Sequence, residues 1–287
     1  MLQNLLVFAI LIPGGISLVV LALTWRVWRK GAGPGAPWAA PLALGAAFLA
    51  GQAGVQGWPG FPPVEAIGWI FFLAAGAALW GIGDSLWRPP AWAQWLARLL
   101  LSGAVPWLLL RPLIEHSFTP AASALWVGGI AAGTVLLWTW LDSLPDRLPG
   151  ASLPLSLAVV ATGAAVTLAL SGSILLGQLA GVLAIGVAAA VPVAWLRPAS
   201  ILSRGAIGVF VVVLAGLWTA GVHYADLPLH AGLLIAGAPA LLALGQLPPV
   251  RRLKGWQSAL VRAGAALLPI TLAAVLAYQA SPPIEMD

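Results

Sequence analysis

The side chains that could do chemistry in this chain are few and fall into three groups. The 287 residues include three histidines, eight acidic residues and no cysteine, which excludes thiol catalysis, disulfides and cysteine-ligated metals. The groups are an external polar cluster, a set of neutral hydrogen-bonding side chains, and a pair of aspartates. The sequence has no phosphate-binding glycine loop and no H-E-x-x-H zinc motif, so we expect neither metal nor cofactor.

The external polar cluster is densest between residues 223 and 230. His223, Asp226 and His230 offer two imidazoles and a carboxylate, a set that can ligate a divalent metal. A proline inside the segment breaks the helix that would align them, which favours an ordinary loop without metal. Glu115 and His116 fall in the other large loop predicted on the same side. The alternative is therefore a pH-sensitive external gate built from both loops.

The neutral hydrogen-bonding set lies within apolar, helix-forming segments. It consists of Gln52, Gln56, Thr162, Thr167, Ser171, Ser173 and Gln178. These residues predict a binding site for a neutral solute. The alternative is helix packing, in which the hydroxyls bond back to carbonyls of their own helix. Because no charge is expected at mid-membrane depth, a strongly charged substrate is not expected.

The aspartate pair carries the only suggestion of an enzyme. Gly81-Ile82-Gly83-Asp84 resembles the G-x-G-D motif of the intramembrane aspartyl proteases, and Pro239-Ala240-Leu241 resembles their P-A-L element. The resemblance implies that Asp84 and Asp142 are the catalytic pair. In that family, however, the partner aspartate precedes the G-x-G-D helix, whereas Asp142 follows it. Asp84 also comes just before Arg88 at a predicted helix end, which favours an interfacial ion pair and a protein that is not an enzyme.

The elements that position these residues are membrane-spanning helices. Apolar residues make up 61% of the chain and charged residues 7%, with a mean hydropathy of +0.99, which excludes a soluble or disordered protein. The apolar residues form solid blocks rather than the alternation of a membrane β-barrel. Because a spanning helix needs about 20 apolar residues, we expect an all-α polytopic bundle with ten spans. Their predicted ranges are 4–25, 39–57, 66–82, 93–113, 122–141, 154–172, 175–195, 202–221, 230–247 and 257–278.

Two arginines fall a turn or two inside predicted spans. Arg98 lies in the fourth span and Arg262 in the tenth. Their long side chains can carry the guanidinium back to the interface. Otherwise their expected partners are Asp84, Asp142 or Asp146, which lie at the same predicted membrane face.

The basic residues predict the orientation. Ten spans place twelve of the thirteen on one side and only Arg111 on the other. By the positive-inside rule the twelve are cytoplasmic and both termini are outside, in the cell membrane. A nine-span alternative merges the sixth and seventh spans and moves the last four bases to the wrong side. The twelve are Arg26, Arg29, Lys30, Arg88, Arg98, Arg147, Arg197, Arg204, Arg251, Arg252, Lys254 and Arg262.

A weak internal repeat suggests how the single transmembrane domain, residues 1–287, is built. Residues 66–81 align with residues 206–221 with six of sixteen positions identical. This match pairs spans five helices apart, and an odd number inverts the second half, as in many secondary transporters. We therefore expect inverted repeats over residues 1–143 and 144–287. In span count and length alone the chain is similar to the drug/metabolite transporter superfamily, whose ten-span members are drawn with both termini inside.

Two functions follow from this sequence. The repeat predicts a transporter-like protein for a neutral or hydrophobic solute. The alternative is a non-catalytic structural or assembly subunit of a membrane complex, because buried charge is scarce and 13 of the 16 tryptophans precede residue 143. The expected partners are the lipid bilayer and, for the second function, other membrane subunits. Nucleic acid is not expected, and a quinone or pigment without histidine ligation would leave no signal.

Overall fold

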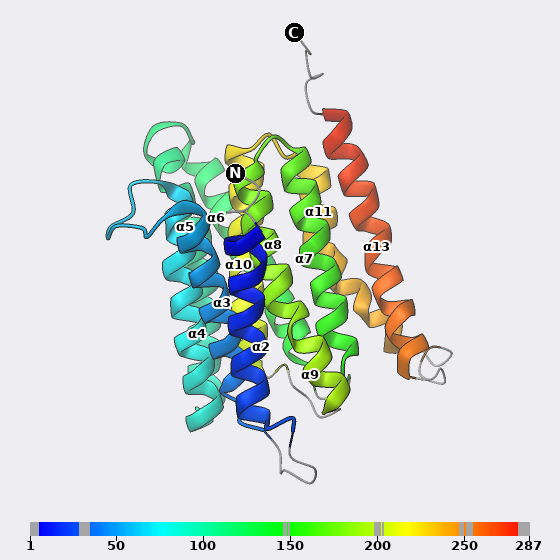
Figure 1. Ribbon diagram of the computed structural model, residues 1–287. Helices are drawn as coiled ribbons and strands as arrows, with labels where there is room; N and C mark the ends of the chain where they lie inside the picture. The colour runs from blue at the N-terminus through cyan, green and yellow to red at the C-terminus, as the bar shows by residue number, and fades with distance from the viewer. Residues whose placement is uncertain are drawn as a thin grey trace.

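The computed structural model describes residues 6–28, 35–145, 148, 150–197, 202, 204–246, 250 and 255–280. These residues form an all-helical bundle that contains no strand in the described ranges (Figure 1). The elements are η1 (Leu6–Leu11), α2 (Ile12–Trp25), α3 (Ala39–Gln56), η2 (Ala66–Gly68), α4 (Trp69–Trp87), α5 (Ala91–His116), α6 (Pro120–Asp142), α7 (Ser152–Leu170), α8 (Ile174–Ala188), α9 (Ala190–Leu196), α10 (Arg204–Tyr224), α11 (Leu229–Gly237), η3 (Ala238–Gln246) and α13 (Gly255–Ala280).

Eight helices in the described part of the chain are long and apolar enough to cross a membrane. They include α4 to α7, the continuous α8–α9 segment, α10 and α13, together with the N-terminal helix. Each of the ten predicted ranges contains helix among its described residues. Two of them fall outside the eight: α3, which carries two glutamines, and α11 with the 3-10 segment η3. The all-helical prediction is confirmed, whereas ten crossings remain a prediction.

The sixth and seventh predicted spans form a tight antiparallel hairpin. Gly172 in the turn has φ of +95°, a conformation that favours glycine. The Ser173 hydroxyl accepts a hydrogen bond from the Leu176 amide at 3.3 Å and begins α8. A Cβ at Gly177 would lie 2.9 Å from the carbonyl oxygen of Ala165, so a glycine is required for the close approach of α7 and α8.

Helix α10 forms the centre of the bundle. It packs against α3, α4, α5, α6, α8 and α11, and 89% of its span is buried. It meets α4 backbone to backbone, because a Cβ at Gly205 would lie 2.5 Å from the Gly81 carbonyl oxygen. The absence of two side chains thus lets the backbones of α4 and α10 approach closely.

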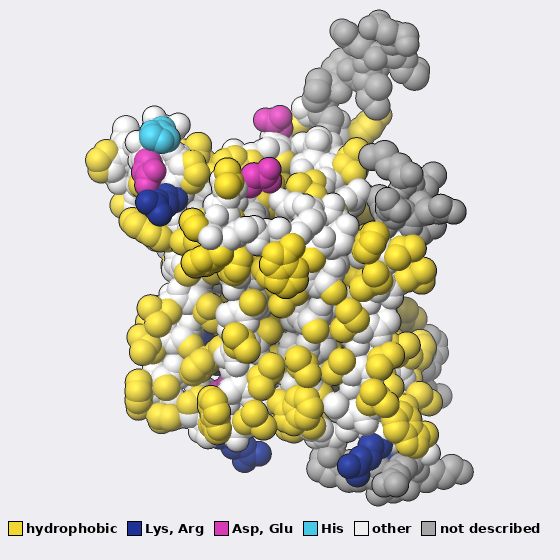
Figure 2. Space-filling view, turned by 60° about the vertical axis from the view of Figure 1, so that its left-hand side comes forward, with side chains coloured by type: hydrophobic (Ala, Val, Ile, Leu, Met, Phe, Trp, Pro, Cys, Tyr) yellow, Lys and Arg dark blue, Asp and Glu magenta, His cyan; other side chains and the backbone are white. Residues whose placement is uncertain are grey.

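The charged side chains are distributed unevenly between the two ends of the bundle. The first and last described residues lie at the same end, drawn at the top of Figure 1. Figure 2 shows basic side chains at the lower end, and acidic and histidine side chains with a neighbouring basic side chain at the upper end. Arg26 and Arg88 follow the lower ends of α2 and α4, whereas Arg111 lies near the upper end of α5. Six of the twelve bases assigned to one side lie outside the described residues.

Candidate functional site

A row of hydrogen-bonded polar side chains extends into the bundle from the upper end of α3. It consists of Glu65, Gln56 and Gln52 and is called the amide file below. Gln56 Nε2 donates to Glu65 Oε2 at 3.2 Å, and Gln52 Nε2 donates to Gln56 Oε1 at 3.2 Å. The Gln52 amide also lies 3.5 Å from the Ile67 carbonyl oxygen. Gln52 is 1% exposed, and its Oε1 accepts no hydrogen bond from any described residue. The file therefore ends in a buried acceptor.

The sequence of α3 explains why these amides are buried. Gln52 and Gln56 are four residues apart and so stack on one helix face. Small residues on the other faces let the neighbouring helices approach closely: Gly51 contacts Val182 of α8 and Pro13 of α2, and Gly54 contacts Phe8. Gln52 lies four residues from the end of α3, about 6 Å along the helix axis.

The third predicted amide, Gln178, lies on the neighbouring helix at a similar depth. Helices α3 and α8 run antiparallel, because Gly51 contacts Val182 and Gly186 contacts Leu44. Gln178 is one turn before Val182 and is half-buried, so it lies on the α3-facing side of α8, level with the upper turn of α3. Gln178 therefore lies toward the same end of the bundle as Gln52 and Gln56, and a site shared by the three amides stays a prediction.

The predicted hydroxyl residues take a different arrangement. Thr162, Thr167 and Ser171 donate to the carbonyl oxygens of Ala158, Gly163 and Leu168 in α7, at 2.8 to 2.9 Å. Helix α7 packs against α8 and α13, whereas α3 packs against α2, α4, α8 and α10. This is the geometry of the helix-packing alternative. A role for these hydroxyls, or for Ser173, in a solute site remains a prediction.

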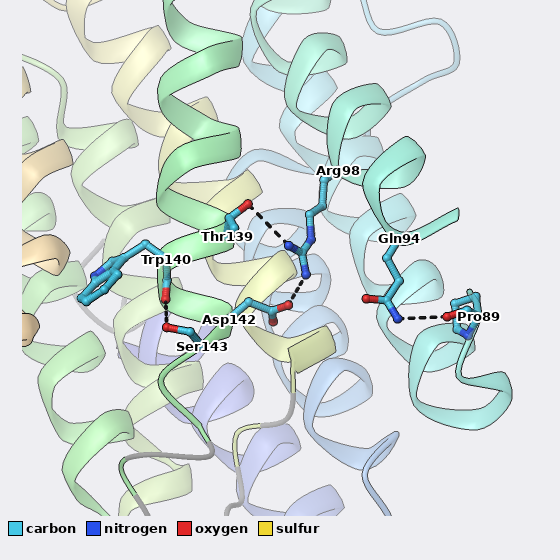
Figure 3. A network of polar contacts seen from close by, with 7 residues as sticks. All are labelled: Pro89, Gln94, Arg98, Thr139, Trp140, Asp142 and Ser143. Carbon is cyan, nitrogen blue, oxygen red and sulfur yellow. Dashed lines mark hydrogen bonds and ion pairs between the residues drawn. The ribbon is translucent and has the colours of Figure 1, made fainter. Parts of the chain in front are cut away.

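A second polar network lies near the lower end, between α5 and α6 (Figure 3). Arg98 Nη2 donates to Asp142 Oδ2, and Nη1 lies 3.4 Å from Thr139 Oγ1. The guanidinium carbon lies 5.5 Å from the Trp95 ring centroid, within cation–π distance. The side chains of Arg98 and Asp142 are 13% and 7% exposed. Arg98 thus forms an ion pair with Asp142, one of the three aspartates expected as its partner from the sequence.

Both aspartates of the protease resemblance line one small pocket. Asp84, Asp142 and Arg98 border it together with Trp80, Gln94, Trp138 and Gly205. Its volume is about 10 Å³, which accommodates roughly one water molecule. A proteolytic pair requires two carboxylates that share a proton. Asp142 instead contacts the Arg98 guanidinium. The interfacial ion pair expected for Asp84 at the end of its helix stays a prediction.

Arg262 has a partner that sequence reasoning missed. Its side chain is 8% exposed, and Nη1 donates to Ser152 Oγ at 2.7 Å, which joins α13 to α7. Ser156 Oγ donates in turn to the Ser152 carbonyl oxygen at 2.9 Å. A serine at the start of a helix is usually interpreted as a cap. Neither the residue type of Ser152 nor its position in the sequence indicates that it contacts a buried arginine. Asp146, the other expected partner, lies outside the described residues.

The structure divides the external polar cluster into separate contacts. Glu115 forms an exposed ion pair with Arg111 at 2.8 Å. The His223 ring lies 4.7 Å from the Trp126 ring and 6.0 Å from that of Phe118, and its Nδ1 is 3.0 Å from the Thr219 carbonyl oxygen. The remaining members, His116, Asp226 and His230, are exposed. No group of three or more metal-ligating side chains occurs among the described residues. The gate remains a prediction.

Comparison with known proteins adds no family to this description. No protein-family model, curated protein or solved structure matches the chain. Its function must therefore be inferred from the positions and contacts of its own residues.

Proposed function

We propose that this protein carries a neutral, hydrogen-bonding or hydrophobic solute across the cell membrane, and that Gln52 contacts the solute. The observation that carries this proposal is the buried Gln52 oxygen, which accepts no hydrogen bond from the described residues. A buried acceptor without a donor costs about 1–3 kcal/mol and is uncommon in native proteins. A solute hydroxyl or amide would supply the missing donor. The neighbouring Gln56 and Gln178 can donate and accept in the same way.

The proposed architecture is a ten-span bundle with both termini outside. In it, α3 and the α11–η3 segment cross the membrane along with the eight longer helices. Two features support the proposal: the described ends of the chain lie at one end of the bundle, as an even number of crossings requires, and the basic residues favour the other end. The amide file would then open to the outside.

The contact between α4 and α10 supports an inverted repeat. The sequence alignment places Leu73 opposite Val213. Gly81, which contacts Gly205, lies eight residues after Leu73, and Gly205 lies eight residues before Val213. The aligned helices therefore pack side by side and run antiparallel, the relation that a two-fold axis in the membrane plane requires of a repeated pair.

Solute flux into proteoliposomes tests the proposal. We expect purified protein to accelerate the entry of at least one of glycerol, urea and uridine, measured by stopped-flow light scattering against protein-free vesicles. Gln52→Met should raise the half-saturating concentration about 3- to 10-fold, the effect of one lost neutral hydrogen bond. Gln94→Met, the same change at the opposite end of the bundle, is the matched control and should leave flux unchanged. Absence of flux for all three solutes would contradict the proposal.

A specific observation favours a structural subunit as the second candidate. Only 17% of the α6 span is buried, and a Cβ at Gly129 or Gly133 would meet nothing within 4 Å. Glycines four residues apart on an exposed face are typical of a helix–helix interface in a membrane. Native purification should then recover a partner at fixed stoichiometry that Gly133→Leu removes. Ala124→Leu, at the far edge of the exposed arc of α6, is the control that should retain it.

A further inference from the structure

The amide file has a direction, which is set by the acceptors that its two glutamines meet. A carboxylate and a backbone carbonyl only accept hydrogen bonds, whereas a glutamine side chain accepts at its oxygen and donates at its nitrogen. Glu65 Oε2 lies 3.2 Å from Gln56 and therefore requires the amino group of that side chain. The Ile67 carbonyl oxygen, 3.5 Å from Gln52, requires the amino group of Gln52 for the same reason.

The link between the two glutamines allows only one order. Because the Gln56 amino group points outward to Glu65, its Oε1 points inward and accepts from Gln52 Nε2 at 3.2 Å. Both protons of the Gln52 amino group are then used, one by Gln56 and one by Ile67. Gln52 Oε1 is left at the buried end, where it accepts no hydrogen bond from a described residue. The file therefore ends in an acceptor because it begins at a carboxylate.

Glu65 is held in place through its backbone, which leaves its side chain available to the file. It comes directly before η2, and its carbonyl oxygen accepts from the Gly68 amide at 3.0 Å. A side chain at this position can cap the helix that follows, but the Glu65 carboxylate makes no such bond to η2. It extends to Gln56 instead. The short η2 segment and the residue before it thus supply both acceptors that orient the glutamines of α3.

We propose that Glu65 is a positioning residue, and that through it the amide file selects solutes that carry an N–H or O–H group. Such a solute donates to Gln52 Oε1. A solute that has only acceptors places its own oxygen against this oxygen, and both remain without a donor in a buried site, which is more costly than a missing contact. This inference rests on the proposed function, because it names the class of solute that the same site takes.

Two substitutions of Glu65 separate its orienting role from its charge. In Glu65→Gln the new side chain can still present a carbonyl oxygen to Gln56, so the order of the file is retained. In Glu65→Lys the ammonium only donates and therefore requires Gln56 Oε1. The Gln56 amino group then turns inward and opposes that of Gln52. Gln52 reverses in response, because its bond to Ile67 is the longest in the file, and its amino group takes the buried end.

Binding of two isomeric amides to the full-length protein tests the selection. Isobutyramide and N,N-dimethylacetamide have the same atoms and one carbonyl each, but only isobutyramide has N–H groups. Glutamine side-chain nitrogens are isotope-labelled, and NMR spectra in detergent micelles follow the Gln52 signal, which Gln52→Met identifies by its loss. We expect isobutyramide to half-saturate the shift of this signal at a concentration about 3- to 10-fold lower than its isomer, the effect of one hydrogen bond.

The variants at the mouth of the file decide the role of Glu65. Glu65→Gln should keep the preference for isobutyramide, and Glu65→Lys should abolish or reverse it. Val64→Lys is the matched control, because it adds the same ammonium at the neighbouring, fully exposed position and leaves the carboxylate in place. It should keep the preference.

The outcomes distinguish this inference from transport itself. Equal binding of the two isomers by the unmodified protein, or a preference that Glu65→Lys does not change, would overturn the inference while leaving solute flux to be judged by itself. A preference for isobutyramide that Glu65→Lys removes, together with absence of flux in proteoliposomes, would support the role of Glu65 and contradict only the proposed transport. A Gln52 signal that neither isomer shifts would overturn both.

Discussion

At the scale of single residues, each of the two largely buried arginines in the described residues has a hydrogen-bonding partner on a neighbouring helix. Arg98 contacts Asp142 and Thr139, and Arg262 contacts Ser152, which suits a low-dielectric interior where an unpaired ion is costly. The sequence limited the partner of Arg98 to three carboxylates at one face, and the structure selects Asp142. The sequence could not reveal Ser152 as the partner of Arg262, because this contact depends on how α13 packs against α7.

The Arg98–Asp142 pair should behave as a coupled unit in unfolding experiments. Asp142→Ala leaves a buried guanidinium without its carboxylate and should lower the free energy of unfolding by about 3–5 kcal/mol. The double variant Arg98→Met/Asp142→Leu removes both charges and should recover most of that loss. Unfolding in mixed detergent micelles, followed by circular dichroism, measures the cycle. Arg111→Ala, at the exposed pair with Glu115, is the control and should change little. Additive single effects would contradict the coupling.

At the scale of helices, hydropathy located the eight long apolar helices better than it located their ends. The third predicted span is 66–82, whereas helix continues to Trp87 and stops before Pro89 and Pro90. Helices extend through the membrane interface until a residue such as proline removes the next amide donor, while a hydropathy boundary marks only the apolar part. The turn between α7 and α8 falls at the break predicted between the ranges 154–172 and 175–195. The contacts between distant helices were not, because they depend on single glycines.

The α4–α10 contact should therefore fail on the addition of one methyl group. In Gly205→Ala the new Cβ would lie 2.5 Å from the Gly81 carbonyl oxygen, and backbone atoms cannot rotate away. We expect a loss of about 1–3 kcal/mol in the free energy of unfolding, the usual cost of overpacking. Gly103→Ala in α5 is the matched control, because its Cβ would meet nothing within 4 Å. Helix propensity alone should make that variant about 0.5–1 kcal/mol more stable.

At the scale of the whole molecule, scarcity of charge determines both what was predictable and what was not. With 7% charged residues, the all-α membrane bundle follows from composition, and the few charges suggest its orientation. The spacing of Gln52 and Gln56 indicated that the two amides share a helix face, and they are hydrogen-bonded. The hydroxyls of α7 bond to their own helix, and a solute site stays a prediction. Periodicity places residues on a helix face, but only packing decides which faces meet.

The absence of cysteine makes the proposed orientation directly measurable, because each introduced thiol is the only one in the chain. Phe61→Cys lies in the exposed segment between α3 and α4 at the upper end, and Pro90→Cys lies in the exposed turn between α4 and α5 at the lower end. In intact cells a membrane-impermeant maleimide should label Phe61→Cys, whereas Pro90→Cys should react only after lysis. His116→Cys at the upper end of α5 should follow Phe61→Cys, because α5 separates it from position 90. The reverse pattern would place the basic end outside, and labelling of Phe61→Cys and Pro90→Cys from the same side would show that α4 does not cross.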